Sequence, residues 1–174
     1  MRRSKKTAIS AIMAALGVAL LYIGSLFDVL DISVACIASL VVLLVLSEMG
    51  VASALSVYAV ITILSLLILP QKLPALFFAL FFGIWPITKL WFEHIGSKTN
   101  PIIGYALKLI LFNIELFLFG YLAKELLELP DSAAIVIIYV VILNVIFILT
   151  DILYGLLVRI YFRTIRKRIS KYLK

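Results

Sequence analysis

Six apolar runs, most of them close to 20 residues long, limit the folds open to this chain more than any other feature of its sequence. A helix of about 20 apolar residues, rising about 1.5 Å per residue, crosses the roughly 30 Å hydrocarbon core of a bilayer. Of the 174 residues, 65% are hydrophobic, whereas a soluble domain is closer to half apolar. The sequence therefore predicts an all-α integral membrane protein with a single transmembrane domain, a six-helix bundle over residues 1–174. The predicted spans are residues 7–27, 32–46, 51–69, 75–92, 101–123 and 133–158, followed by a basic tail at 159–174.

The basic residues gather on one side of this predicted bundle. Six spans bring both termini to the same side, which then carries 13 of the 16 Lys and Arg residues, most of them in the amino-terminal head and the tail. Cytoplasmic segments carry the excess of Lys and Arg, so we expect a cell-membrane protein with both termini in the cytoplasm. The apolar run behind the head continues to Phe27, longer than a signal-peptide core, and we expect no cleavage. Apolar residues interleaved in the tail favour contact with anionic lipid over nucleic-acid binding.

The fourth span carries a predicted kink and a predicted interfacial anchor. Proline removes a backbone donor, so Pro86 should kink the helix. Trp85, Trp91 and Lys89 are typical of the membrane–water interface, where the Lys89 amine would reach the headgroups. Residues 93–100 follow as a predicted polar loop.

The fifth span differs from the others because it carries opposite charges deep inside it, Lys108 and Glu115. They are seven residues apart, which places them on one face of a helix. In the sixth span Asn144 and Asp151 have the same spacing, so two antiparallel helices would pair Lys108 with Asp151 and Glu115 with Asn144 in one register. Lys108 and Asp151 are best explained as an intramembrane ion pair that locks two helices. Asn144 does not neutralise Glu115, which is left either to be protonated or to meet a ligand or ion.

A candidate substrate pocket follows from this arrangement. Glu115 lies near the middle of its span, and the other polar and aromatic groups lie toward the predicted outer half or in the outer links. The predicted pocket residues are Glu115, Asn144, Tyr139 and Tyr121, with Asp28 from the first link and Gln71 from the third.

Nothing in the sequence indicates an enzyme. His94 has no HExxH partner, and there is no GxSxG elbow, P-loop or GxGxxG motif. Cys36 is the only cysteine, which excludes a disulfide within the chain and a cysteine-based metal site. We therefore expect no catalytic residues, no cofactor and no metal site, and any energised transport requires a partner or an ion gradient.

The first span carries a stripe of small residues, Thr7, Ala11, Ala15 and Ala19, each four positions apart. Faces of this kind let two helix backbones approach closely in lipid, where packing drives helix association. The stripe is either an internal packing face or a docking face for another subunit, and the spacing alone favours neither.

With this stripe in the run from Ala11 to Ala19, the chain length and the six predicted spans, the whole chain resembles the substrate-binding S components of bacterial energy-coupling factor (ECF) transporters. The resemblance implies an S-component-like bundle whose Ala11, Ala15 and Ala19 face docks on a membrane coupling subunit with ATPase subunits. It also implies a small, vitamin-like substrate bound in the outer half. The substrate stays open, because the chain has no vitamin-specific signature and lacks the amino-terminal histidine typical of metal-ion members.

Two other functions remain open at this point. One is a structural scaffold with an S-component-like bundle, similar to the MreD-type cell-shape proteins, which bind protein partners rather than solutes. The other is an ion- or proton-coupled carrier that uses Glu115. Co-purification with ATPases or with cell-wall machinery would separate transport from scaffolding, and pH-dependent flux through the isolated protein would indicate the carrier.

Overall fold

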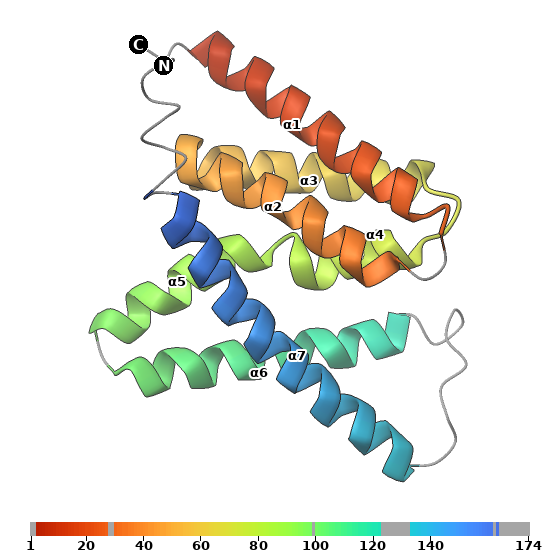
Figure 1. Cartoon of the computed structure of the whole chain (residues 1–174), viewed down its shortest axis with the longest axis vertical. Helices are drawn as coiled ribbons and strands as arrows, with labels where there is room; N and C mark the ends of the chain where they lie inside the picture. Colours follow the sequence, from red (N-terminus) through yellow and green to blue (C-terminus); the bar gives the residue numbers. More distant parts are fainter. Residues whose placement is uncertain (1–2, 28–29, 99, 123–132, 162, 164–174) are drawn as a thin grey trace. The chain divides into compact units, whose positions relative to one another are not determined.

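A computed structural model describes residues 3–27, 30–98, 100–122, 133–161 and 163. Regular structure in these residues is entirely helical (Figure 1). The helices are α1 (Arg3–Gly24), α2 (Asp31–Met49), α3 (Val51–Ile68), α4 (Leu73–Phe77), the π-helix η1 (Phe78–Phe82), α5 (Trp85–Lys98), α6 (Pro101–Leu122) and α7 (Ala133–Ile160). They form two compact units, Met1–Leu127 and Glu128–Lys174, which are described separately below.

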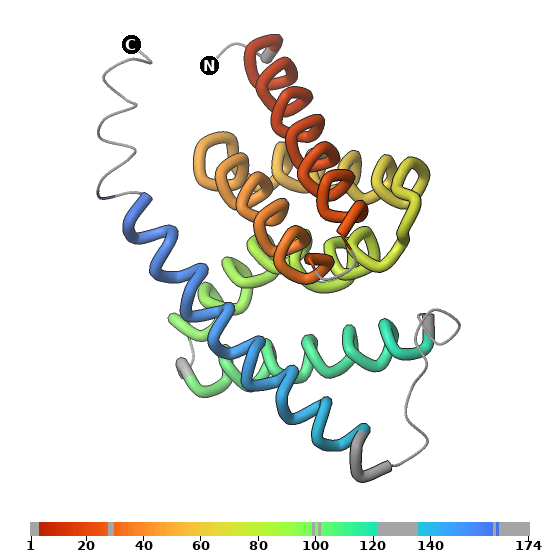
Figure 2. Tube along the Cα trace, turned by 45° about the vertical axis from the view of Figure 1, so that its right-hand side comes forward, coloured from red at the N-terminus to blue at the C-terminus, as the bar shows by residue number. Residues whose placement is uncertain are grey.

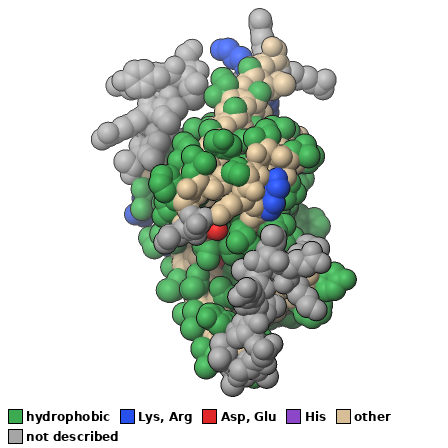
Figure 3. Space-filling model, turned by 90° about the vertical axis from the view of Figure 1, so that its right-hand side faces the viewer, with side chains coloured by type: hydrophobic (Ala, Val, Ile, Leu, Met, Phe, Trp, Pro, Cys, Tyr) green, Lys and Arg blue, Asp and Glu red, His purple; other side chains and the backbone are tan. Residues whose placement is uncertain are grey.

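Six helical runs are long and apolar enough to cross a membrane, which confirms the predicted all-helical class with six spans. These runs are Ser4–Gly24, Asp31–Met49, Val51–Ile68, Leu73–Lys98, Ile102–Tyr121 and Val136–Ile160. Figure 3 shows one face of the molecule, where apolar side chains cover most of the described surface and charged groups are few. An apolar exterior of this kind is what lipid contact requires, because hydrocarbon offers no partner to a polar group.

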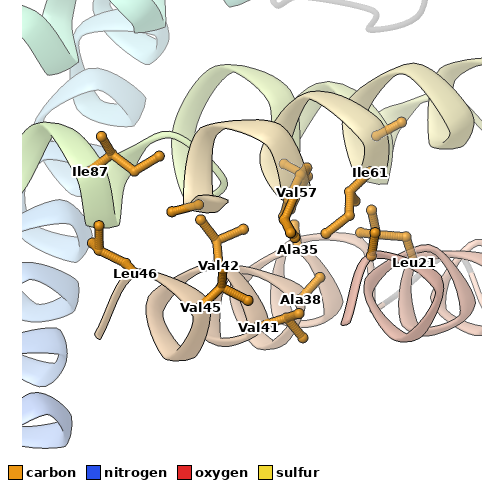
Figure 4. Close-up of a cluster of buried hydrophobic side chains, with 14 of the residues drawn as sticks. Leu21, Ala35, Ala38, Val41, Val42, Val45, Leu46, Val57, Ile61 and Ile87 are labelled. Carbon is orange, nitrogen blue, oxygen red and sulfur yellow. The ribbon is translucent and has the colours of Figure 1, made fainter. Parts of the chain in front are cut away.

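The first unit has its core between α1, α2 and α3, which lie side by side (Figure 2). Figure 4 shows buried side chains of α2, among them Val42 and Val45, between those of α3 and the neighbouring helices. On α1, Gly17 lies against the Ile61 side chain of α3, and a methyl group at Gly17 would collide with it. Small residues thus bring α1 close to its neighbour, as packing in lipid favours.

A glycine makes the sharp reversal between α2 and α3 possible. Gly50 has a φ of 88°, in the left-handed region where a side chain is strained. Its N–H donates to the carbonyl of Leu46 at 3.1 Å, and its own carbonyl accepts from the N–H of Ala54 at 3.1 Å. One residue therefore closes the end of one helix and starts the next.

The fourth span is broken near its middle rather than simply kinked. The N–H of Gly83 donates to the carbonyl of Phe78, five residues back, at 2.7 Å, which closes the π-helix η1. Two residues after this bond the regular α-helix resumes at Trp85, followed by Pro86, which has no N–H to donate. The helix is thus interrupted just before Pro86, at a π-turn, a feature often found at functional sites, and the predicted kink at Pro86 itself stays a prediction.

Helices α5 and α6 form an antiparallel hairpin (Figure 1). Asn100 caps α6: its Oδ1 accepts the N–H of Ile102 at 3.0 Å, and Pro101 occupies the first helical turn, where a missing N–H costs nothing. A Cβ built at Gly104 would lie 3.1 Å from the carbonyl oxygen of Phe92 and 3.2 Å from the Cα of Gly96. The two backbones therefore meet at a glycine contact. The predicted loop over 93–100 is wrong for its first six residues, because α5 continues to Lys98 against α6.

The described part of the second unit is the helix α7. Asn144 and Asp151 lie on one face of it, as their spacing predicts. The Asn144 side-chain amide donates to the carbonyl of Val140 at 2.9 Å, within the same helix. Most of the predicted basic tail lies outside the described residues.

Candidate functional site

Three charged side chains of the first unit form a cluster between α5 and α6. The Nζ of Lys89 lies 3.3 Å, and the Nζ of Lys108 3.6 Å, from the same Oε1 of Glu93. The two lysine side chains are 9% and 5% exposed, and the glutamate is 51% exposed. Lys108 also lies over the Tyr105 ring, 5.1 Å from its centroid, a distance at which a cation is attracted to the ring face.

This cluster corrects the interpretation of Lys89 as a residue that reaches for the headgroups. Its amine is buried beside a carboxylate one helical turn away, because α5 continues through Glu93 instead of ending at Phe92. Glu93 is the residue that sequence reasoning missed. The spacing Lys89–Glu93, four residues apart, was the available signal, since such pairs face each other on a helix.

The inner face of α6 is defined by spacings of three and four residues. Gly104, Lys108, Phe112 and Phe119 are buried, and Glu115 is half-buried between the two phenylalanines in sequence. The prediction that Lys108 and Glu115 share one face is therefore confirmed. Asn113, between them in sequence, is exposed, and its amide donates to the Leu109 carbonyl at 2.8 Å.

Four aromatic rings pack together along the face of α6 that carries Glu115. Phe119 of α6 stacks on Phe77 of α4 with centroids 4.7 Å apart. Phe81 of η1 packs against Phe112 at 5.6 Å and against Phe119 at 5.4 Å. We call these four residues, Phe77, Phe81, Phe112 and Phe119, the phenylalanine cluster. Such tilted and stacked geometries are the favoured ones for aromatic pairs.

Glu115 has a buried carboxylate oxygen beside this cluster. Its Oε2 is inaccessible to solvent and has no hydrogen-bond partner among the described residues. Tyr58 of α3 lies within electrostatic range of Glu115, and the Thr62 side chain faces the Tyr58 hydroxyl. By distance and angle, the buried Thr62 Oγ1 also makes no hydrogen bond within the described part of the chain. Polar oxygens of α3 and α6 thus lie within electrostatic range of one another in a largely apolar unit.

Tyr58 ties this region to the broken fourth span. Its hydroxyl donates to the carbonyl of Ala79 at 2.7 Å, inside η1. A π-turn shifts backbone pairing by one residue, which leaves carbonyl groups without their usual helical donor. Sequence reasoning did not identify Tyr58 or Ala79, and no sequence signal shows which carbonyl a π-turn releases.

The predicted pocket residues are spread over both units. In the first unit Glu115 lies on the inner face of α6, Gln71 is half-buried in the link before α4, and Tyr121 is 74% exposed. Asn144 and Tyr139 belong to the second unit, and Asp28 lies outside the described residues. The single six-residue pocket stays a prediction, as do the pairs Lys108 with Asp151 and Glu115 with Asn144, which would join the two units.

The small-residue stripe of α1 is on the outside. Thr7, Ala11, Ala15 and Ala19 are exposed. The face of α1 that packs into the core is a different one, which includes the buried residues Ala14, Gly17, Leu21 and Gly24. The spacing left two interpretations open, an internal packing face and a docking face for another subunit. Packing within the first unit does not use this stripe.

Two further features bear on ligands. In the part of the chain that the structure describes, no group of three or more His, Cys, Asp and Glu side chains could hold a metal ion. An open hollow along the outer face of α6 is lined by apolar residues and Asn113, and Glu115 does not line it.

Comparison with known proteins adds no relative. No protein-family model matches the chain, and neither the curated proteins nor the solved structures contain a match.

Proposed function

We propose that this chain is the membrane-embedded substrate-binding subunit of an uptake transporter, similar to the S components of ECF transporters. In this function both termini are cytoplasmic, the chain binds a small molecule, and the stripe Thr7, Ala11, Ala15 and Ala19 docks on a membrane coupling subunit with ATPases. The single observation that carries the proposal is the exposure of that stripe.

The physical argument concerns what an exposed row of small side chains does in lipid. Between Thr7 and Ala19 the stripe extends over about 18 Å of helix axis. Alanine fills lipid-facing space poorly, but it lets another helix approach closely, and van der Waals contact is the main attraction between helices in a membrane. Because α1 uses Ala14 and Gly17 for its own packing, a second small-residue face supports docking of a separate helix.

A carrier function has one specific observation in its favour. The half-buried Glu115, with a carboxylate oxygen that no described hydrogen bond satisfies, is the kind of intramembrane acid found in proton and ion pathways. A carrier would move its solute with the isolated protein in vesicles and would respond to a pH gradient. A substrate-binding subunit would require its ATPase partners for transport.

The docking test uses an affinity-tagged chain produced in its native membrane and purified in mild detergent. Ala15→Leu places a bulky group in the middle of the stripe. Ala59→Leu makes the same change at an exposed position of α3 and is the matched control. We expect the unmodified chain and Ala59→Leu to retain an integral membrane subunit together with ATPases, and Ala15→Leu to lose both. Recovery of cell-wall machinery would indicate a scaffold, and recovery of no ATPase would refute the proposal.

A further inference from the structure

Glu115 and the phenylalanine cluster together define a ligand chemistry that the fold alone does not specify. We propose that they recognise a small organic ammonium ion, a protonated amine carried on an apolar or aromatic body. This inference rests on the proposed function only in taking the bound molecule to be the transported one.

The first argument is charge. The other ionisable group on the inner face of α6, Lys108, lies two turns away and is paired with Glu93. Glu115 takes part in neither ion pair of the cluster between α5 and α6, and its buried Oε2 accepts no hydrogen bond from the described residues. A buried carboxyl oxygen without a donor is costly, and an N–H donor with positive charge is the partner that offsets this cost best.

The second argument is the environment of that oxygen. Aromatic ring faces are negative and attract cations within about 6 Å of a ring centroid, and two rings of the phenylalanine cluster lie one turn before and after Glu115 on α6. The same faces disfavour an anionic ligand beside a carboxylate. The side chains of Phe112 and Phe119 flank Glu115 on α6, and Phe81 contacts both. An ammonium ion is attracted electrostatically to both the carboxylate and the rings. A neutral alcohol has no charge and gains neither attraction.

The third argument is the number of acceptors. The Thr62 side chain, whose Oγ1 is buried, faces the Tyr58 hydroxyl, and Tyr58 is within electrostatic range of Glu115, so hydroxyl oxygens of α3 lie on the side of Glu115. An ammonium group has several N–H donors, so one acceptor does not satisfy it. A second oxygen from α3 favours a primary ammonium, with three N–H groups, over a tertiary one, which has a single N–H.

The test compares three probes that share one aromatic body: 2-phenylethylammonium, 2-phenylethanol and 3-phenylpropanoate. Dissociation constants are measured by isothermal titration on the full chain in lipid nanodiscs. We expect the ammonium probe to bind most tightly and the carboxylate probe to bind least. Glu115→Gln, which keeps the shape of the side chain, should weaken binding of the ammonium probe by about tenfold or more, because it removes a charge-assisted hydrogen bond.

Two further variants separate recognition from folding. Phe81→Leu keeps an apolar side chain but removes the central ring, and it should weaken ammonium binding by about threefold. Asn113→Ala, on the exposed face of the same helix, should leave binding unchanged and serves as the control. Equal binding of all three probes, binding of none of them, or an undiminished ammonium preference in Glu115→Gln would overturn the inference.

The outcome is separable from that of the docking test. Co-purifying ATPases without an ammonium preference would remove this ligand class and leave the transport subunit standing. An ammonium preference that depends on Glu115, without ATPases, would keep the ligand class and refute the ECF-like function.

Discussion

Replacing Glu93 by Gln should destabilise the first unit by about 2 kcal/mol, a value between those typical of exposed and buried ion pairs. The carboxylate lies 3.3 Å from one buried lysine amine and 3.6 Å from another. At an effective dielectric constant of about 20, each attraction is about 5 kcal/mol before the costs of desolvation. Because half of the Glu93 side chain is exposed, water screens much of this attraction, and exposed pairs contribute only about 0.2–1 kcal/mol. Breaking a fully buried pair costs about 3–5 kcal/mol, since the remaining charge is left uncompensated.

The measurement is the free energy of unfolding in bicelles, obtained by steric trapping, for Glu93→Gln, Lys108→Met and the double variant. Glu93 and Lys108 interact directly, so the effects of the two substitutions should not add, and the double-mutant cycle should show coupling of about 1 kcal/mol. The isosteric Gln keeps the helix propensity and the volume of the side chain, which isolates the charge. A change smaller than about 0.5 kcal/mol for Glu93→Gln, with additive effects in the cycle, would refute the shared-carboxylate reasoning.

Two other predictions concern contacts within the same unit. Tyr58→Phe removes the hydroxyl that donates to the Ala79 carbonyl and should cost about 0.6–1.7 kcal/mol in the same unfolding assay; an unchanged stability would mean that η1 does not need this bond. Gly104→Val should separate α5 from α6, because even its Cβ would lie 3.1 Å from the Phe92 carbonyl oxygen and 3.2 Å from the Cα of Gly96. A lower unfolding temperature and faster amide exchange in Glu93–Lys98 would be expected, and native values for both would contradict this account of the glycine contact.

Hydrophobicity predicts the six spans because lipid imposes one requirement on all of them: each backbone group must be paired within its own segment. The prediction was poorest where polar residues continue a helix. Glu93 and His94 suggested a loop, yet α5 runs through them, because its backbone meets α6 at Gly96 and Gly104. Tertiary packing, which a local pattern does not contain, decides that boundary.

The candidate site was predictable only along single helices. The seven-residue spacing correctly placed Lys108 and Glu115 on one face of α6, and the same spacing would have found Phe112 and Phe119 beside them. The rings across from them, Phe77 and Phe81, depend on how the broken fourth span packs against α6. That packing follows from a π-turn and is not encoded in any periodicity.

The two ionisable groups on the inner face of α6 have different surroundings. This difference assigns a structural role to Lys108 and a binding role to Glu115. Lys108 has an anion and a ring face in the first unit, so its charge is compensated without any ligand. Glu115 shares its face of α6 with Phe112 and Phe119, and one of its oxygens makes no hydrogen bond to the described residues. Lys108→Ala should therefore lower the folded yield and leave ligand affinity in the surviving protein nearly unchanged, whereas Glu115→Gln should fold normally and bind its ligand weakly. Both quantities can be read from one preparation, as the monodisperse fraction in size-exclusion chromatography and as the dissociation constant for 2-phenylethylammonium. If the two substitutions exchanged these effects, Lys108 would belong to the binding site and Glu115 to the scaffold.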